Sequence, residues 1–283
     1  MTGRQRERRH RRTRAAVVAA VLLAGAGPAC AGCSGGDAVA GDSRGGEAVT
    51  VLRQAADRLV DAGSSKARTS MEMAAGGTRV TIRGAGVYDY RKRMGRLKVL
   101  LPQDPAGVAE RRPITELLAP GALFMKNRGA GVPPDKWVRV DTRTLSDGNL
   151  VTGGATDPFT AAEVLLGTRT ATYVGRTEVA GTAVRHYRGT ADLADAARRA
   201  SKGNEGPLKA AAEGFATAAV PFDAYLDDEG RVRKVRHRFS FLNGQQKSSV
   251  AVASTTLLYD FGASALVRLP RTDDIYAGRI AEE

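Results

Sequence analysis

The chain has 283 residues, of which 42% are hydrophobic, and a formal net charge of +13. Its two cysteines, Cys30 and Cys33, stand near the N-terminus, and beyond them only His186 and His237 could supply imidazole ligands. So sparse a set argues against a zinc site of the usual Cys/His type and against disulfides in the rest of the chain. We expect no metal and no cofactor. Nor do we expect nucleic acid as a partner, because the sequence has no Arg-rich recognition helix and no aromatic stacking platform.

Residues 1–32 have the pattern of a lipoprotein signal peptide. Seven arginines stand against a single glutamate in residues 4–14, and residues 15–27 are an unbroken run of Ala, Val, Leu and Gly. This run has the length of a secretory h-region and is too short to span a bilayer. Small residues precede Cys33, and two acyl chains on that thiol would suffice for stable anchoring. We therefore predict a mature protein that begins at lipidated Cys33, on the extracytoplasmic face of the cell membrane.

Alternatives to this processing remain open. Cys30 stands where a leucine is usual, and taking Cys30 itself as the acceptor places Gly27 and Pro28 upstream, which fits the pattern worse. An ordinary secretory peptide with a freely soluble product is the other alternative. The pair Arg11–Arg12 is a weak twin-arginine signal, because apolar residues do not follow it. Cleavage after residue 32 would remove seven of 43 Lys and Arg and one of 30 Asp and Glu, which leaves a net charge of +7. That charge suits approach to an anionic membrane surface.

The next segments predict a tether and one domain. Residues 33–46 are the lipidated cysteine and a stretch dominated by Gly, Ser, Asp and Ala, as in a flexible tether. Residues 47–283 are expected to form a single domain that starts with a helix over 48–59, where Ala and Leu recur at helical spacing. Alternation with period two then predicts strands. The expected strands of this part are 67–74, 78–86, 87–90, 97–101, 123–126 and 137–140.

The second half of the chain begins with a well-punctuated helix over residues 157–167. Asp157 can cap it, and Pro158 suits the first helical position. Further on we expect strands at 170–174 and 183–189, helices at 191–201 and 207–218, and strands at 220–226, 235–242, 249–259 and 265–269. Turns of hairpin length join most strands. The pattern therefore predicts an α+β domain with one large antiparallel sheet and helices packed on one face.

Catalytic signatures are mostly absent, and we predict no catalytic residue and no enzyme. The segment Gly262–Leu266 begins like a nucleophile elbow but lacks the closing glycine. The acidic run Asp227–Glu229 is expected to be a solvated hairpin tip rather than a calcium or acid/base site. His237 shares a strand face with apolar residues and is expected to belong to the core. A basic stretch is either a solvated sheet face or a contact with anionic lipid headgroups: Arg83, Arg91, Lys92, Arg93, Arg96 and Lys98.

Several structural motifs carry a family resemblance. They are the strands 67–74 and 78–86, Lys136–Asp141, the hairpin Pro221–Val232, Tyr259–Gly262 and Val267–Pro270. Together with the lipidation signal around Cys33, the tether and the first helix, this layout resembles the LppX/LprAFG-type lipid-carrier lipoproteins of actinobacteria. These share the half-barrel fold of the periplasmic carrier LolA. The likeness covers residues 47–275. It implies a large curved antiparallel sheet, with helices over its concave face and an apolar cavity between them.

The resemblance also implies a function. We expect a cell-envelope lipoprotein that binds or transfers acylated lipids in this cavity without catalysis, so that membrane lipid is both anchor and cargo. The alternative is a cell-surface adaptor or sensor with a filled core, which would bind an envelope protein. The residues expected to line the cavity are Met71, Met73, Val80, Ile82, Leu97, Val99, Leu101, Leu165, Leu166, Phe215, Phe239 and Phe241.

Overall fold

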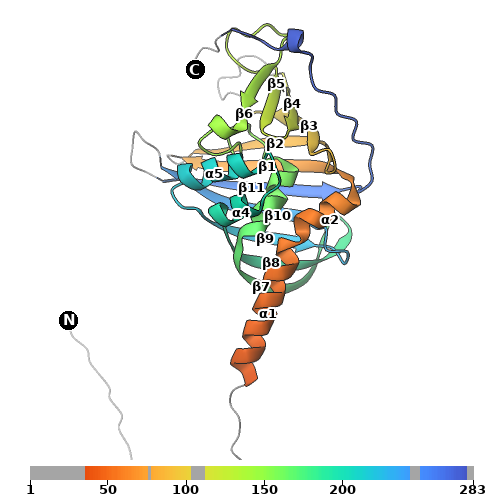
Figure 1. The fold of residues 1–283 in the computed structure, drawn as a ribbon, viewed down its shortest axis with the longest axis vertical. Helices are drawn as coiled ribbons and strands as arrows, with labels where there is room; N and C mark the ends of the chain where they lie inside the picture. The colour runs from red at the N-terminus through yellow and green to blue at the C-terminus, as the bar shows by residue number, and fades with distance from the viewer. Residues whose placement is uncertain (1–35, 76–77, 103–111, 243–248, 279–283) are drawn as a thin grey trace, which may run out of the picture.

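The structure is a computed structural model that describes residues 36–75, 78–102, 112–242 and 249–278. The predicted signal peptide and Cys33 lie outside the described residues. Within them, an eleven-stranded sheet forms the body of the molecule (Figure 1). Its strands are β1 (Ser64–Ala75), β2 (Thr78–Asp89), β3 (Met94–Leu100), β4 (Ile114–Ala119), β5 (Ala122–Lys126), β6 (Val138–Asp141), β7 (Thr168–Val179), β8 (Thr182–Asp192), β9 (Ala219–Leu226), β10 (Val232–Leu242) and β11 (Ser249–Tyr259).

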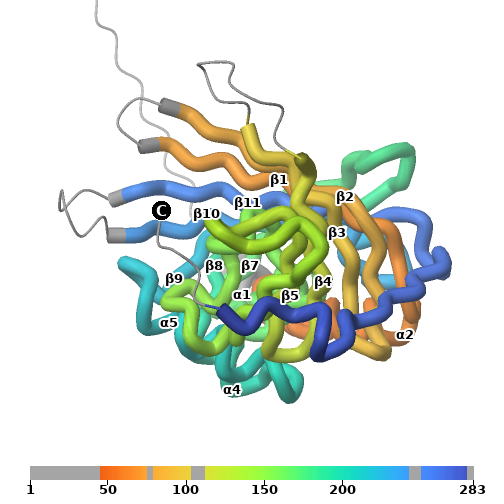
Figure 2. The backbone as a smooth tube through the Cα atoms, turned by 90° about the horizontal axis from the view of Figure 1, so that it is seen from above, coloured from red at the N-terminus to blue at the C-terminus, as the bar shows by residue number. Residues whose placement is uncertain are grey.

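The sheet consists of two antiparallel meanders joined in the middle. Its order is β6-β5-β4-β3-β2-β1-β11-β10-β9-β8-β7, so β1 to β6 and β7 to β11 are each consecutive. The pairing of β1 with β11 joins the two meanders and places Met71 beside Ser254, while Ile82 flanks Met71 on the other side. Figure 2 shows the β1–β2 and β10–β11 hairpins extending side by side from the body. The predicted antiparallel α+β half-barrel is confirmed.

Alternation along the strands separates an inner from an outer face. On β3, Leu97 and Val99 are fully buried, whereas Arg96 and Lys98 are exposed. Because successive side chains of a strand point to opposite faces, this pattern assigns Leu97 and Val99 to the concave face. The concave face carries one continuous hydrophobic core that reaches from β6 at one edge of the sheet to β7 at the other.

The helices lie on the concave side of the sheet, as predicted (Figure 1). They are α1 (Gly36–Arg53), α2 (Ala55–Ala62), α3 (Pro158–Glu163), α4 (Leu193–Arg199) and α5 (Glu205–Gly214), with the 3-10 turns η1 (Thr142–Thr144), η2 (Val164–Gly167) and η3 (Thr272–Asp274). Helix α1 packs on β7, and α4 packs on α5. Helix α1 begins at Gly36, inside the segment expected to be a tether. Extending a helix costs little free energy once its packed end has formed. None of the helices in the described ranges is both long and apolar enough to cross a membrane.

The connection from β6 to β7 determines what fills the half-barrel. These two strands are opposite edges of the sheet, so residues 142–167 must cross the whole concave face. Helix α3 and turn η2 lie on this crossing. Asp157 caps α3 as predicted, its carboxylate accepting the backbone N–H of Phe159 and Thr160 at 2.8 and 2.9 Å. We call residues 145–157 the plug loop.

Three strand expectations differ from the structure. Strand β2 is continuous through residues 78–89, where the sequence suggested two strands. Strand β4 was not expected, because it is buried on both faces and its inward Glu116 breaks the apolar pattern. Residues 265–269 are extended but form no strand. They belong to a C-terminal segment that runs over the outside of the sheet and ends in a bridge between Trp137 and Ile275.

Candidate functional site

A cavity of about 780 Å³ opens at the concave face, where the plug loop meets the strands β1 to β4. We call it the mouth cavity. It is lined by Met73, Ile82, Leu101, Arg112, Ile114, Asn127, Arg128, Gly129, Ala130, Val132, Pro133, Pro134, Val151 and Thr152. Its size lies within the range of ordinary small-molecule sites, which is roughly 300–1,000 Å³.

The cavity has an apolar wall and a basic rim. Met73 on β1 and Ile82 on β2 lie diagonally across the β1–β2 pair, because Met73 pairs with Val80 and Ile82 with Met71, and Ile114 is the first residue of β4. Arg112, just before β4, and Arg128, in the β5–β6 connection, also line the cavity. This combination can bury an apolar chain and hold an anionic group at its end.

The plug loop closes the inner end of the cavity and is held by its own side chains. The carboxylate of Asp147 accepts the backbone N–H groups of Asn149, Val151 and Thr152 at 3.0, 2.8 and 2.6 Å. Gly154 has φ +86° and passes so close to Ile82 that an added Cβ would lie 3.3 Å from its side chain. The loop therefore follows a fixed path over the floor of the half-barrel.

The loop is also tied to the sheet. The hydroxyl of Thr156 donates to the carbonyl of Leu150 at 2.7 Å and lies 2.6 Å from the hydroxyl of Ser254 on β11. All three residues are buried. Because buried polar groups without partners are costly, this pairing favours the closed arrangement of the loop.

The sequence-predicted cavity residues are divided among three places. Met73, Ile82 and Leu101 line the mouth cavity. Deeper in the packed core lie Met71, Leu97, Val99 and Leu165, with partly buried Val80 beside them, and Leu166 is half-buried. Under helix α5, Phe215 stacks on Phe239 with centroids 5.0 Å apart and meets Phe241 edge-on at 4.6 Å. The structure thus brings three of the twelve predicted residues to one cavity, and all of the others except Leu166 belong to the packed core.

Glu116 is a buried carboxyl that sequence reasoning missed. It lies on β4 opposite Leu97 and Met125 and is fully buried. Neither carboxyl oxygen has a hydrogen-bond partner among the described residues. Burial raises the pKa of Glu116 to about 8, against the opposing effect of Arg128. Its carboxyl is therefore mostly neutral at pH 7, beside the cavity wall that Ile114 forms.

The two histidines lie on opposite faces of the sheet and form no common site. His237 is buried on the concave face, Nε2 lacks a hydrogen-bond partner among the described residues, and burial lowers its pKa to about 3. On the outer face, His186 Nε2 lies 2.9 Å from Asp223, which also accepts from Arg188 and Arg238 at 2.9 and 2.7 Å. Burial opposes ionisation of Asp223, but these hydrogen bonds lower its pKa to about 2.

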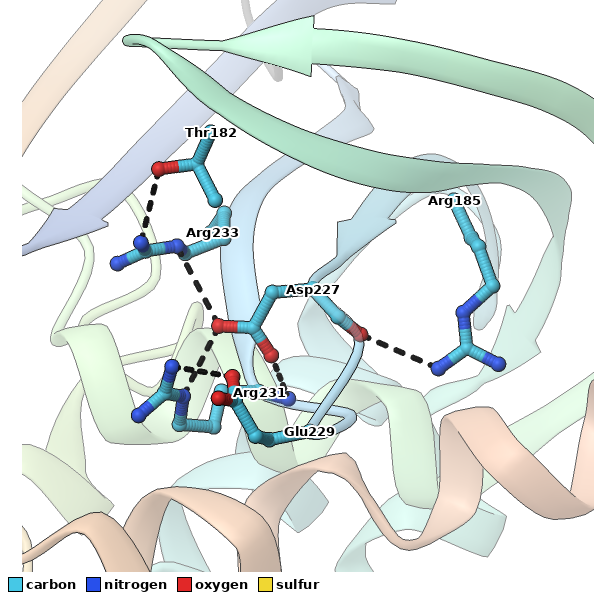
Figure 3. Close-up of polar contacts among 6 residues, drawn as sticks. All are labelled: Thr182, Arg185, Asp227, Glu229, Arg231 and Arg233. Carbon is cyan, nitrogen blue, oxygen red and sulfur yellow. Dashed lines mark hydrogen bonds and ion pairs between the residues drawn. The ribbon is translucent and has the colours of Figure 1, made fainter.

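The acidic hairpin tip after β9 is a structural cluster (Figure 3). Asp227 is buried and its carboxylate accepts Arg231 Nε at 2.9 Å, with Arg233 Nε at 3.4 Å, while its carbonyl accepts from Arg185 at 3.1 Å. Both Arg231 and Arg233 also lie over the ring of Phe261, 4.6 and 5.0 Å from its centroid. The cluster fastens the β9–β10 turn to β8 and to the end of β11. No group of three or more potential metal ligands gathers in the described part of the chain.

Comparisons with known proteins give likenesses of fold. The chain matches no family model and no curated protein. Among solved structures, it is similar to lipoprotein LppX of Mycobacterium tuberculosis, at 10% identity and TM-score 0.49 over 79% of this chain and 99% of that one. LprF of Mycobacterium bovis matches at 13% identity and TM-score 0.39, over 80% and 97%. A putative outer membrane lipoprotein-sorting protein domain of Vibrio parahaemolyticus matches at 10% identity and TM-score 0.32, over 78% and 94%.

LppX and LprF belong to the family whose motifs the sequence resembles. The matches extend over most of each chain, but both the sequence identity and the TM-score are low, so they assign no ligand and no function to this chain. What this chain binds has to be argued from its own residues.

Proposed function

We propose that this protein is a membrane-anchored, extracytoplasmic lipoprotein that binds or transfers acylated lipids at the mouth cavity, without catalysis. The observation that carries the proposal is the cavity itself, which combines an apolar strand wall with the two arginines of its rim. Each methylene buried on that wall would contribute about 0.8 kcal/mol. Arg112 and Arg128 would hold an anionic headgroup through charge-assisted hydrogen bonds.

The charge balance of the cavity supports an anionic cargo. Glu116 is the acidic group beneath the cavity wall, and its raised pKa leaves the carboxyl mostly protonated near neutral pH. A neutral carboxyl does not offset the rim arginines. A bound carboxylate or phosphate would therefore meet a net positive environment at one end and an apolar wall at the other.

The plug loop sets the depth of binding. With Asp147 holding the loop in place, the cavity of about 780 Å³ takes part of an acyl chain, and deeper entry requires the Thr156–Ser254 contact to open. If the plug loop opens, the two buried contacts of the Thr156 hydroxyl are lost and apolar contacts with the lipid are gained. The anchor at Cys33 would keep the domain beside the membrane that supplies the lipid.

Native mass spectrometry with lipid extraction tests the proposal. The chain from Ser34 onward, purified from an actinobacterial host without detergent, should carry acylated lipid in near-stoichiometric amount. Thr152→Trp should lose most of this lipid, because Thr152 is exposed in the cavity and the indole would fill it. Thr170→Trp, on the exposed side of β7, is the matched control and should stay loaded.

A second candidate function is favoured by the filled interior. Residues 142–167 cross the concave face and contribute to one continuous core, which is the arrangement expected for an adaptor or sensor that binds an envelope protein. A clean lipid-free mass for the unmodified chain, with added lipid failing to bind, would refute the carrier function. That result would leave the adaptor as the better proposal.

A further inference from the structure

The outer face of the central strands carries a second apolar depression, on the side of the sheet away from the helices and the mouth cavity. It encloses about 520 Å³, and its surface is almost entirely apolar. We call it the outer trough. Its lining residues are Arg68, Thr69, Ser70, Arg83, Gly84, Ala85, Lys98, Leu100, Pro113, Thr255 and Leu257.

Cross-strand register explains why a depression forms on this face. One row of outward residues runs Lys98, Ala85, Arg68 and Leu257 across β3, β2, β1 and β11, and the next row runs Leu100, Arg83, Ser70 and Thr255. Directly opposed residues on one face stand side by side. Ala85 and Ser70 are small and form the floor, while the longer side chains on either side form the walls. The aliphatic stems of lysine and arginine supply much of the apolar lining.

The rim of the trough is positively charged. Arg68, Arg83 and Lys98 are all exposed, and none of them forms a salt bridge with an acidic residue in the part of the chain that the structure describes. The lining set itself includes no acidic residue. On the same face, Arg236 is paired with Glu72 at 3.2 Å. The three rim cations are therefore available for an external anion.

An exposed leucine stands beside these cations. Leu100 is 54% exposed and lines the trough next to Arg83. An occupant that suits this site must present an apolar chain to the floor and to Leu100, and a negative charge to the rim. An anionic phospholipid at a membrane surface meets both requirements.

We propose that the outer trough binds an anionic phospholipid of a membrane surface, with its acyl portion against Ala85 and Leu100 and its headgroup at Arg83, Lys98 and Arg68. This site is separate from the mouth cavity, since the two open on opposite faces of the sheet. It does not depend on the proposed cargo. The trough would orient the sheet on a membrane whether or not the mouth cavity holds lipid.

Vesicle co-sedimentation tests the site with the chain from Ser34, which keeps every helix and strand of the structure and has no acyl anchor. Binding is expected for vesicles of phosphatidylcholine mixed with phosphatidylglycerol and not for phosphatidylcholine alone. Arg83→Gln with Lys98→Gln should weaken binding about thirtyfold, given roughly 1 kcal/mol for each cation at the surface. The charge-matched control, Lys202→Gln with Lys209→Gln, changes two exposed lysines near helices α4 and α5 and should change binding less than about twofold.

The position of the lipid is tested with a photoreactive phosphatidylglycerol whose acyl chain carries a diazirine. Cross-links should map to the outward residues of β2, β3 and β11, and Leu100→Ser should reduce them. Equal loss of vesicle binding in both double variants would overturn the proposal. Cross-links confined to the mouth cavity would also overturn it, while supporting lipid binding at that other site.

Discussion

Glu116 offers a sensitive check on how the half-barrel is built. The carboxyl is fully buried between Leu97 and Met125, and neither oxygen has a partner among the described residues. Glu116→Gln keeps the shape of the side chain and removes its ionisation. We expect this variant to be more stable than the unmodified protein at alkaline pH and to approach it at pH 5.

The magnitude follows from the pKa of Glu116. Burial raises it to about 8, from 4.5 for the exposed group. Between these two values the unfolded chain has lost the proton that the folded chain retains, so stability falls as pH rises. The slope is at most about 1.4 kcal/mol for each pH unit and smaller near each pKa, so the loss between pH 5 and pH 8 is roughly 3.5 kcal/mol. Above pH 8 the folded group ionises as well, and the pH dependence from this group ends.

Urea unfolding measured from pH 5 to pH 8.5 on both proteins provides the assay. Other groups, such as Asp157 with its pKa raised to about 6 by burial, are present in both proteins and cancel in the difference. The difference in unfolding free energy should grow by about 4 kcal/mol across this range. Parallel pH profiles would show that water or a partner reaches Glu116, and would refute its placement in a dry core.

Two further predictions concern buried charge and a buried imidazole. Asp227→Asn should destabilise the protein by about 3 kcal/mol, because it leaves Arg231 without its buried partner. Asp228→Asn, at the exposed neighbouring position, should cost less than about 1 kcal/mol. Thermal unfolding of both variants measures the difference, and equal effects would contradict the role of Asp227. His237→Leu should remove part of the loss of stability in acid: the unfolded imidazole, with its pKa near 6.5, takes up a proton that the folded one, with its pKa lowered to about 3, does not. Between pH 7 and pH 5 this amounts to about 2 kcal/mol in urea unfolding, and an unchanged pH dependence in the variant would count against burial of His237.

Local sequence patterns were enough to find most elements. Period-two alternation on β3, where Leu97 and Val99 alternate with Arg96 and Lys98, identified both the strand and its inward face. The N-cap at Asp157 was equally local, because an Asp followed by Pro and then helical spacing satisfies the free N–H groups of the first turn. Strand β4 escaped detection because both of its faces are covered, which removes alternation.

The candidate site was predicted only in part. Met73, Ile82 and Leu101 were named from strand spacing and line the mouth cavity. Arg112 and Arg128 stand outside any regular pattern, so no periodicity marks them. Leu97 and Phe239, expected at a cavity, are packed instead, since alternation reports which face a residue is on and not whether that face is filled.

The sequence by itself determined the antiparallel α+β class and most of the strands with their inner faces. Only the tertiary structure decided that β1 pairs with β11 and that β6 and β7 form opposite edges. That order sends residues 142–167 across the concave face, and the crossing both fills the half-barrel and leaves the mouth cavity at its side. The physical reason is that hydrogen-bonding patterns between strands distant in sequence depend on the packing of the whole chain, whereas alternation and capping depend on neighbours a few residues away.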